Sequence, residues 1–185
     1  VFGLGLRPAG PGGTGDFAAR DSKSYPLAPP EARGWGHGLM QIDWGSFPEW
    51  LEANNWKDPA TNMRKGADVL LAKEAFLLVQ PASEATVYLT RASAHRRGIE
   101  LPPGEDGRKW PDPRPIAEAE RRLFAATAAY NTGEGNVLKS LACGASPDIT
   151  TAHGDYARTV WESATGWQSA FDARLAESWR KDHPP

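Results

Sequence analysis

Between residues 46 and 164 the apolar residues recur mostly at the spacing of an α-helix. The clearest start is Asp58-Pro59, because aspartate is a favoured N-cap and proline is favoured at the first helical position. Apolar residues follow from Met63 through the run 76–79. We therefore predict a long helix from residue 59, and its strongly apolar sequence places it at the centre of the core.

The same criteria predict further helices, each with a start or stop signal. Ser46, with Glu49 three residues later, has the spacing of a capping box, and Gly133 and Gly144 are stop signals. The predicted helices cover 46–55, 83–98, 115–129, 136–142 and 156–164, the last capped by His153-Gly154-Asp155 and extending toward Trp179.

Two segments lack a helical pattern. Residues 1–36 hold eight Gly and five Pro, which predicts a structured loop or a small hairpin. A second Pro-rich stretch predicts an irregular insertion near 99–115. Strand patterning is otherwise nearly absent, so the fold class is mainly α, and 185 residues suit a single domain over 1–185.

Composition narrows the function classes. The net charge is −2 and the pI is near 6.1, which argues against a nucleic-acid partner. No apolar run reaches the ~20 residues of a membrane span. Cys143 is the one cysteine and the four His are scattered, so no metal site is predicted. The eight Trp exceed what a core of this size requires.

Two segments carry candidate chemistry. In 34–44, glycines bracket Trp35 and His37, and Gln41 and Asp43 follow two residues apart, which on a strand would put them on one face. The plainer interpretation is a glycine turn before a buried segment. In 129–137, Tyr130 and Asn131 end a helix before a Gly-x-Gly-Asn turn, which could also be a simple pair of helix caps.

These segments resemble one known family. Gly38-Leu39-Met40-Gln41-Ile42-Asp43 is similar to a motif of goose-type lysozymes and related lytic transglycosylases. The segment 129–137 resembles that family's Ala-Tyr-Asn-x-Gly-x-Gly-Asn-Val motif, and 56–66 resembles the start of its central helix. The resemblance implies a lysozyme-like fold acting on peptidoglycan glycan strands, with cleavage of the β-1,4 bond from N-acetylmuramic acid to N-acetylglucosamine. It implies an extracellular or periplasmic location and requires no metal or cofactor.

The resemblance also assigns residues. Asp43 matches an aspartate that helps to hold the attacking water, and Asp16, in a Gly-rich loop, is the preferred match for a second one, with Asp21 and Glu31 as weaker matches. The implied saccharide contacts are Gln41, Met40, Tyr130 and Asn131. We add Trp35 and His37, which precede the motif, and Gly38, its first residue. Indole rings stack on sugars, so Trp35 and Trp44 are the first candidates among the Trp, whereas Trp50, Trp56, Trp161 and Trp167 are expected in the core.

The family's general acid, a glutamate, falls just before Val1 in this numbering. Because Val1 is not a translation start, we expect that glutamate on a preceding segment. Two alternatives remain: a peptidoglycan-binding or accessory module that lacks the acid or takes it from a partner chain, and an internal acid at Glu134 or Glu31. The water-holding aspartates favour an inverting hydrolase over a lytic transglycosylase. Outside this family, glycine loops and Trp would also suit a helical protein-interaction module.

Overall fold

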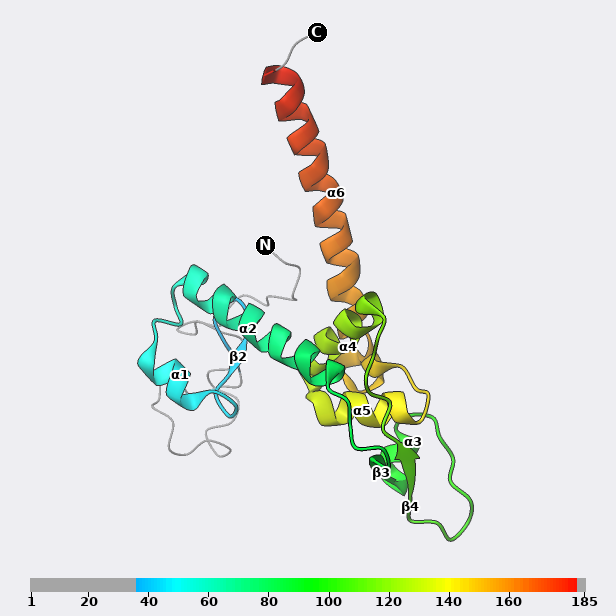
Figure 1. The fold of residues 1–185 in the computed structure, drawn as a ribbon. Helices are drawn as coiled ribbons and strands as arrows, with labels where there is room; N and C mark the ends of the chain where they lie inside the picture. Colours follow the sequence, from blue (N-terminus) through cyan, green and yellow to red (C-terminus); the bar gives the residue numbers. More distant parts are fainter. Residues whose placement is uncertain (1–35, 183–185) are drawn as a thin grey trace. The chain divides into compact units, whose positions relative to one another are not determined.

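The protein is described by a computed structural model that covers the backbone of residues 36–182 and the side chains of that range except 170, 171 and 173–182. It is mainly helical, as the sequence predicts (Figure 1). Its contacts form two compact units, an N-terminal unit within residues 36–72 and a C-terminal unit of residues 73–182. The expected loop or hairpin over 1–35 lies outside the described residues.

The N-terminal unit is built on a small hairpin and two helices. Strand β1 (Gly36–His37) pairs antiparallel with β2 (Ile42–Asp43) to form a small hairpin. Helix α1 (Pro48–Ala53) and the first turns of α2 (Pro59–Leu78) follow. The core of this unit consists of Ile42, Trp44, Leu51 and Trp56.

The two helix starts in this unit differ from each other in how they are capped. Asp58 caps α2 as predicted, because its Oδ2 accepts a hydrogen bond from the Thr61 amide at 2.8 Å. The predicted Ser46 cap is wrong. Phe47 occupies the N-cap position of α1, and the Ser46 hydroxyl instead donates to Asp43 Oδ2 at 2.7 Å.

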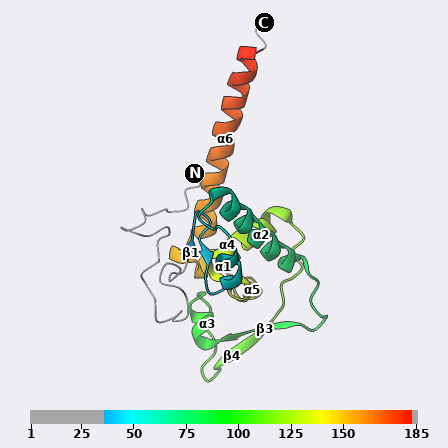
Figure 2. The ribbon, with the colours of Figure 1, turned by 90° about the vertical axis from the view of Figure 1, so that its left-hand side faces the viewer.

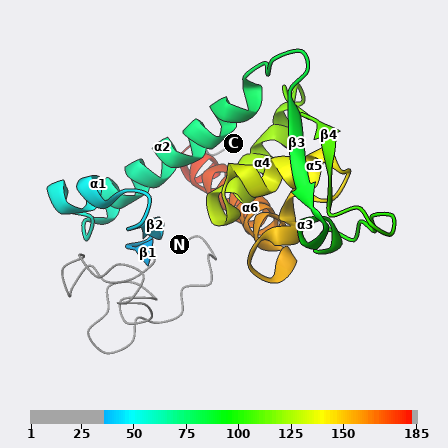
Figure 3. The same ribbon diagram turned by 90° about the horizontal axis from the view of Figure 1, so that it is seen from below.

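The C-terminal unit is a packed group of helices. Helix α4 (Ala119–Thr132) contacts α5 (Glu134–Ala142) and α6 (Tyr156–Asp182) (Figure 3). Two short 3-10 helices, η2 (Pro147–Thr150) and η3 (Ala152–Gly154), connect α5 to α6. Small side chains on α4, from Ala125 to Ala129, are buried and allow the close approach. These helices match the predicted ones, although α4 begins later because Pro113 and Pro115 precede it and the Ile116 amide bonds to Leu77 O.

The predicted helix over 83–98 is wrong in its first half. Strand β3 (Thr86–Thr90) occupies that part and pairs antiparallel with β4 (Gly107–Pro111), and only α3 (Arg91–His95) is helical (Figure 2). The β-branched and aromatic residues of Thr-Val-Tyr-Leu-Thr favour a strand. Strand β4 likewise interrupts the insertion that was expected to be irregular. Leu89, Ala94 and Leu101 form a local core beneath the sheet.

Helix α2 is less buried than its apolar sequence predicts. Leu77 is fully buried and Val69 nearly so, but Leu71 and Leu78 are 60% and 48% exposed. The expectation of a central core helix is therefore wrong for much of its length. No described helix is long and apolar enough to cross a membrane.

Helix α6 is capped from a different place than predicted. The buried carboxylate of Asp148, on η2, accepts hydrogen bonds from the amides of Ala157 and Arg158 and from the Thr151 hydroxyl. Asp155, predicted as part of the cap, contributes its backbone carbonyl to the Thr159 amide. Asp148, eight residues before the first residue of α6, thus supplies the side-chain hydrogen bonds of an N-cap.

Candidate functional site

The Gly38–Asp43 segment, called the Gly38–Asp43 turn below, consists of the tight turn that joins β1 to β2 and of strand β2 itself. Both the backbone amide and the side-chain Nε2 of Gln41 donate to the carbonyl of Gly38, at 3.2 and 2.8 Å. Gln41 adopts a left-handed backbone with φ of 51°. That conformation is uncommon for a residue other than glycine, and such strained residues concentrate at functional sites.

Asn62 on α2 holds this turn in place by two hydrogen bonds to its backbone. Its side chain is fully buried, its Oδ1 accepts from the Met40 amide at 2.7 Å, and its Nδ2 donates to the His37 carbonyl at 2.9 Å. One amide side chain therefore satisfies both a donor and an acceptor of the turn backbone, on either side of Gly38.

Two glycines make that approach possible. A Cβ added at Gly38, whose φ is 72°, would lie 2.5 Å from Asn62 Cγ, and one added at Gly66 would lie 2.5 Å from Met40 Cγ. Neither position has room for a side chain. The Gly38–Asp43 turn is thus seated on α2 by direct backbone and side-chain contact.

The polar groups of the turn are Gln41 and Asp43. Strand β2 begins at Ile42, so strand alternation does not relate Gln41 to Asp43 as the sequence suggested. Gln41 Oε1 is buried and accepts no hydrogen bond from a described residue. The Asp43 carboxylate is partly exposed and is oriented by the Ser46 hydroxyl. An acceptor without a partner and an oriented carboxylate thus lie two residues apart.

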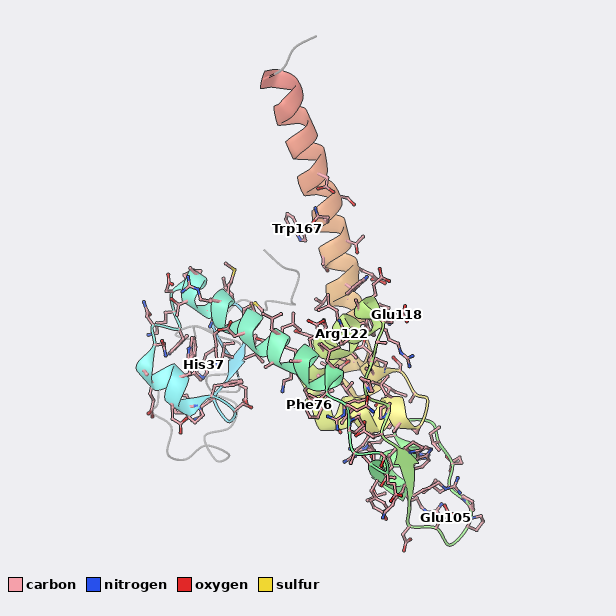
Figure 4. All side chains as sticks on the ribbon, viewed as in Figure 1. His37, Phe76, Glu105, Glu118, Arg122 and Trp167 are labelled. Carbon is pink, nitrogen blue, oxygen red and sulfur yellow. The ribbon has the colours of Figure 1, made fainter. Side chains whose placement is uncertain are left out.

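The aromatic residues around the turn are mostly structural. His37 is 3% exposed, and its ring meets the rings of Trp56 and Trp44 edge-on at centroid distances of 4.8 and 6.1 Å. These contacts place His37 in the packing of the N-terminal unit rather than on its surface (Figure 4). Trp44 is buried as well, which corrects its choice as a sugar platform, and Trp35 lies outside the described residues.

The second candidate segment ends helix α4, in the C-terminal unit. Tyr130 is partly buried, and burial, with a contribution from neighbouring Tyr156, raises the pKa of its phenol well above the usual range. Tyr130 therefore keeps its proton across the physiological pH range. Asn131 is exposed, and its Oδ1 accepts from the Ala152 amide at 2.8 Å, which fixes the orientation of its amide group.

Glu134, an alternative general acid, is paired with a cation. Its carboxylate accepts a hydrogen bond from Lys73 Nζ. Burial raises the pKa of Glu134, but the hydrogen bond and charge of Lys73, together with its own backbone amide, outweigh burial and hold that pKa below the ordinary value. A general acid needs the opposite shift, so Glu134 does not suit that role.

The sequence-predicted residues are therefore divided between the units. Met40, Gln41 and Asp43 share one turn of the N-terminal unit, and Tyr130 and Asn131 share one helix end of the C-terminal unit. Asp16, Asp21 and Glu31 lie outside the described residues. Trp167, expected in the core, is 51% exposed and extends from α6 (Figure 4).

Sequence reasoning left two polar residues without a structural role. Asn62 holds the Gly38–Asp43 turn, and its signal was an uncharged amide side chain near the start of α2, four residues before Gly66. Arg97 is 3% exposed. Its burial could not be predicted from the sequence, because two consecutive arginines, Arg96 and Arg97, are typical of a solvent-exposed segment. No group of three or more described His, Cys, Asp or Glu side chains could hold a metal ion.

Comparison with known proteins returned no match to a protein-family model, to a curated protein or to a solved structure. The resemblance to goose-type lysozymes therefore rests on the motifs themselves.

Proposed function

We propose that this chain is a peptidoglycan hydrolase of the lysozyme type, cleaving the β-1,4 bond between N-acetylmuramic acid and N-acetylglucosamine. The observation that carries the proposal is the Gly38–Asp43 turn. Its sequence resembles the saccharide-cleft motif of goose-type lysozymes, its backbone is strained at Gln41, and it presents a partly exposed carboxylate at Asp43. A strained and rigidly supported turn is what a preorganised binding site requires.

In this proposal Asp43 positions the water that attacks the sugar. An inverting glycosidase needs a carboxylate on the far side of the scissile bond from the general acid, with room for water between them. The Ser46 hydroxyl donates to Asp43 Oδ2, which fixes the carboxylate and leaves Oδ1 without a hydrogen bond to any described residue. Asp16 is proposed as the second carboxylate that positions this water.

The resemblance assigns sugar contacts to residues of each candidate segment, and each segment is considered by itself. Gln41 Oε1 would accept a hydrogen bond from a sugar hydroxyl or acetamide N–H, which removes the cost of leaving it buried and unpaired. Asn131 already uses its Oδ1, so its Nδ2 would donate to a sugar oxygen. Burial raises the pKa of Tyr130, so its hydroxyl stays neutral, and the resemblance assigns Tyr130, with Asn131, to the saccharide contacts.

The general acid is proposed to be the glutamate that the resemblance puts just before Val1. Such an acid needs a raised pKa, whereas Lys73 helps to hold the pKa of Glu134 below its ordinary value. A chain that never carries this glutamate would instead bind glycan strands as an accessory module, or act with an acid from a partner chain. Action on cell-wall glycans implies an extracellular or periplasmic location.

The test incubates the full-length protein with purified sacculi, followed by mass spectrometry of the released fragments. The proposal predicts soluble muropeptides with reducing ends. Fragments with 1,6-anhydro ends would assign the protein to the lytic transglycosylases instead. Co-sedimentation without release would assign it to the binding modules, and neither release nor co-sedimentation would reject peptidoglycan as its target.

A further inference from the structure

Arg97 is a buried cation that follows helix α3 in the C-terminal unit. It is 3% exposed, and all three guanidinium nitrogens donate to neighbouring residues. Its hydrogen bonds run from Nε to Ser140 Oγ at 3.0 Å, from Nη1 to Ser93 O and Oγ at 2.8 Å each, and from Nη2 to Asn136 O at 3.1 Å and Asn136 Oδ1 at 3.3 Å.

None of these acceptors is a carboxylate. Burial lowers the pKa of Arg97, which reflects the cost of removing its charge from water. A buried charge costs several kcal/mol, and a well-packed apolar side chain of similar volume often stabilises a fold as well or better. Stability alone therefore gives no reason for an arginine here. Its five N–H groups in a fixed plane do, however, specify the relative placement of the groups they bind.

The bonds of Arg97 lead to the end of α4 through Asn136. Asn136 accepts from Arg97 and uses its Nδ2 to donate to Thr132 O at 2.9 Å. The Thr132 hydroxyl in turn donates to Thr150 O at 3.0 Å. The neighbouring residue, Asn131, accepts from the Ala152 amide. A continuous set of hydrogen bonds thus connects Arg97 to the last turn of α4.

We propose that Arg97 is a positioning residue, which acts through Asn136 to hold the last turn of α4 and with it the side chains of Tyr130 and Asn131. The consequence for saccharide binding rests on the proposed function, whereas the consequence for the geometry of the turn does not. Removal of Arg97 lets the Asn136 side chain rotate and releases Thr132.

Three variants separate positioning from stability. Arg97→Met removes the guanidinium but keeps an apolar stem. Asn136→Asp keeps an acceptor for Arg97 and loses the donor to Thr132, so it tests the connection even where Arg97→Met fails to fold. Ser93→Ala is the matched control, because it removes one Arg97 acceptor on α3 and leaves the route through Asn136 in place.

The first readout is amide hydrogen exchange measured by NMR. We expect exchange at Gly133 and Ala152, whose amides bond to Ala129 O and Asn131 Oδ1, to rise at least tenfold in Arg97→Met and Asn136→Asp. The reference is the Asp112 amide, which follows β4 and bonds to Ala85 O. In Ser93→Ala the three amides should change together. Wild-type rates at Gly133 and Ala152 in Asn136→Asp would overturn the proposal.

The second readout is affinity for a soluble N-acetylglucosamine hexasaccharide. Affinity should fall about tenfold in Arg97→Met and Asn136→Asp and stay at the wild-type value in Ser93→Ala. Equal losses in all three variants would mean that Arg97 is only structural. A wild-type protein that neither binds the saccharide nor releases muropeptides would reject the proposed function, and the exchange rates would still decide the role of Arg97.

Discussion

At the Gly38–Asp43 turn, single residues on α2 decide whether the backbone can adopt its strained form. Asn62 supplies two hydrogen bonds, and Gly66 supplies the space that the Met40 side chain fills. The sequence predicted that Gly38, Met40 and Gln41 contribute to one candidate site, because they lie in one motif. It did not predict the left-handed Gln41, since that conformation depends on contacts from 20 or more residues away.

Gly66 gives a direct test of this packing. Gly66→Ala should destabilise the protein by about 1–3 kcal/mol, because the new methyl group overlaps Met40 in a tightly packed place. The matched control is Gly166→Ala in α6, where a Cβ meets no atom within 4 Å. There the better helix propensity of alanine should stabilise by up to about 1 kcal/mol. Urea unfolding measures both, and equal effects at the two glycines would contradict the packing described here.

The Lys73–Glu134 pair gives a prediction for pH. Because the folded pKa of Glu134 is lowered, the pair stabilises the fold above the unfolded pKa of the carboxyl and loses that effect as pH falls through the folded pKa. Lys73→Met should therefore cost stability at pH 7 and progressively less below about pH 4.5.

NMR titration of the Glu134 carboxyl in Lys73→Met provides the second measurement. Without Lys73, burial is left opposed only by the backbone hydrogen bond, so the pKa of Glu134 should rise relative to wild type. Lys65→Met is a suitable control, because Lys65 lies near Phe47 and Trp50 in the other unit. A Glu134 pKa unaffected by Lys73→Met would show that the ion pair does not hold it.

At the scale of helices and strands, the start and stop signals of a helix predicted its ends correctly where no distant segment competed for the same residues. Asp58-Pro59 and Gly133 marked a helix start and a helix end correctly. Strand β3 was missed because the alternating pair Val87 and Leu89 was grouped with Ala94, which lies seven residues after Val87 as on one face of a helix. Its partner β4 lies in a Pro-rich stretch. Pairing with a segment some 20 residues later decided the outcome.

Helix α2 shows the same limit for burial. Its apolar residues were expected to be buried together, but the structure separates Leu77, fully buried, from Leu71, 60% exposed. Leu77→Ala should cost about 2–5 kcal/mol, whereas Leu71→Ala should stay within about 0.5 kcal/mol of wild type. Thermal and urea unfolding of the two variants measures the difference, and a large loss in Leu71→Ala would show that this face of α2 is covered.

At the scale of the whole chain, the sequence predicted the mainly helical class and the two candidate segments, and the structure assigns those segments to different compact units. The two candidate segments were recognisable from the sequence because a close approach of the backbone requires glycine and a polar turn requires particular side chains, so few residue types fit these positions. Arg97 and Asp148 were not, because a buried charge is identified by its surroundings rather than by its neighbours in the chain.

The proposed function depends most on Asp43, which is proposed to take part in glycan cleavage. The most direct measurement is the rate at which the full-length protein clears a suspension of purified sacculi, compared with Asp43→Asn and with Asp68→Asn, an exposed aspartate on α2. We expect a loss of about a hundredfold in Asp43→Asn, with an unchanged fold by circular dichroism, and wild-type clearance in Asp68→Asn. Clearance at the wild-type rate by Asp43→Asn would contradict this role of Asp43.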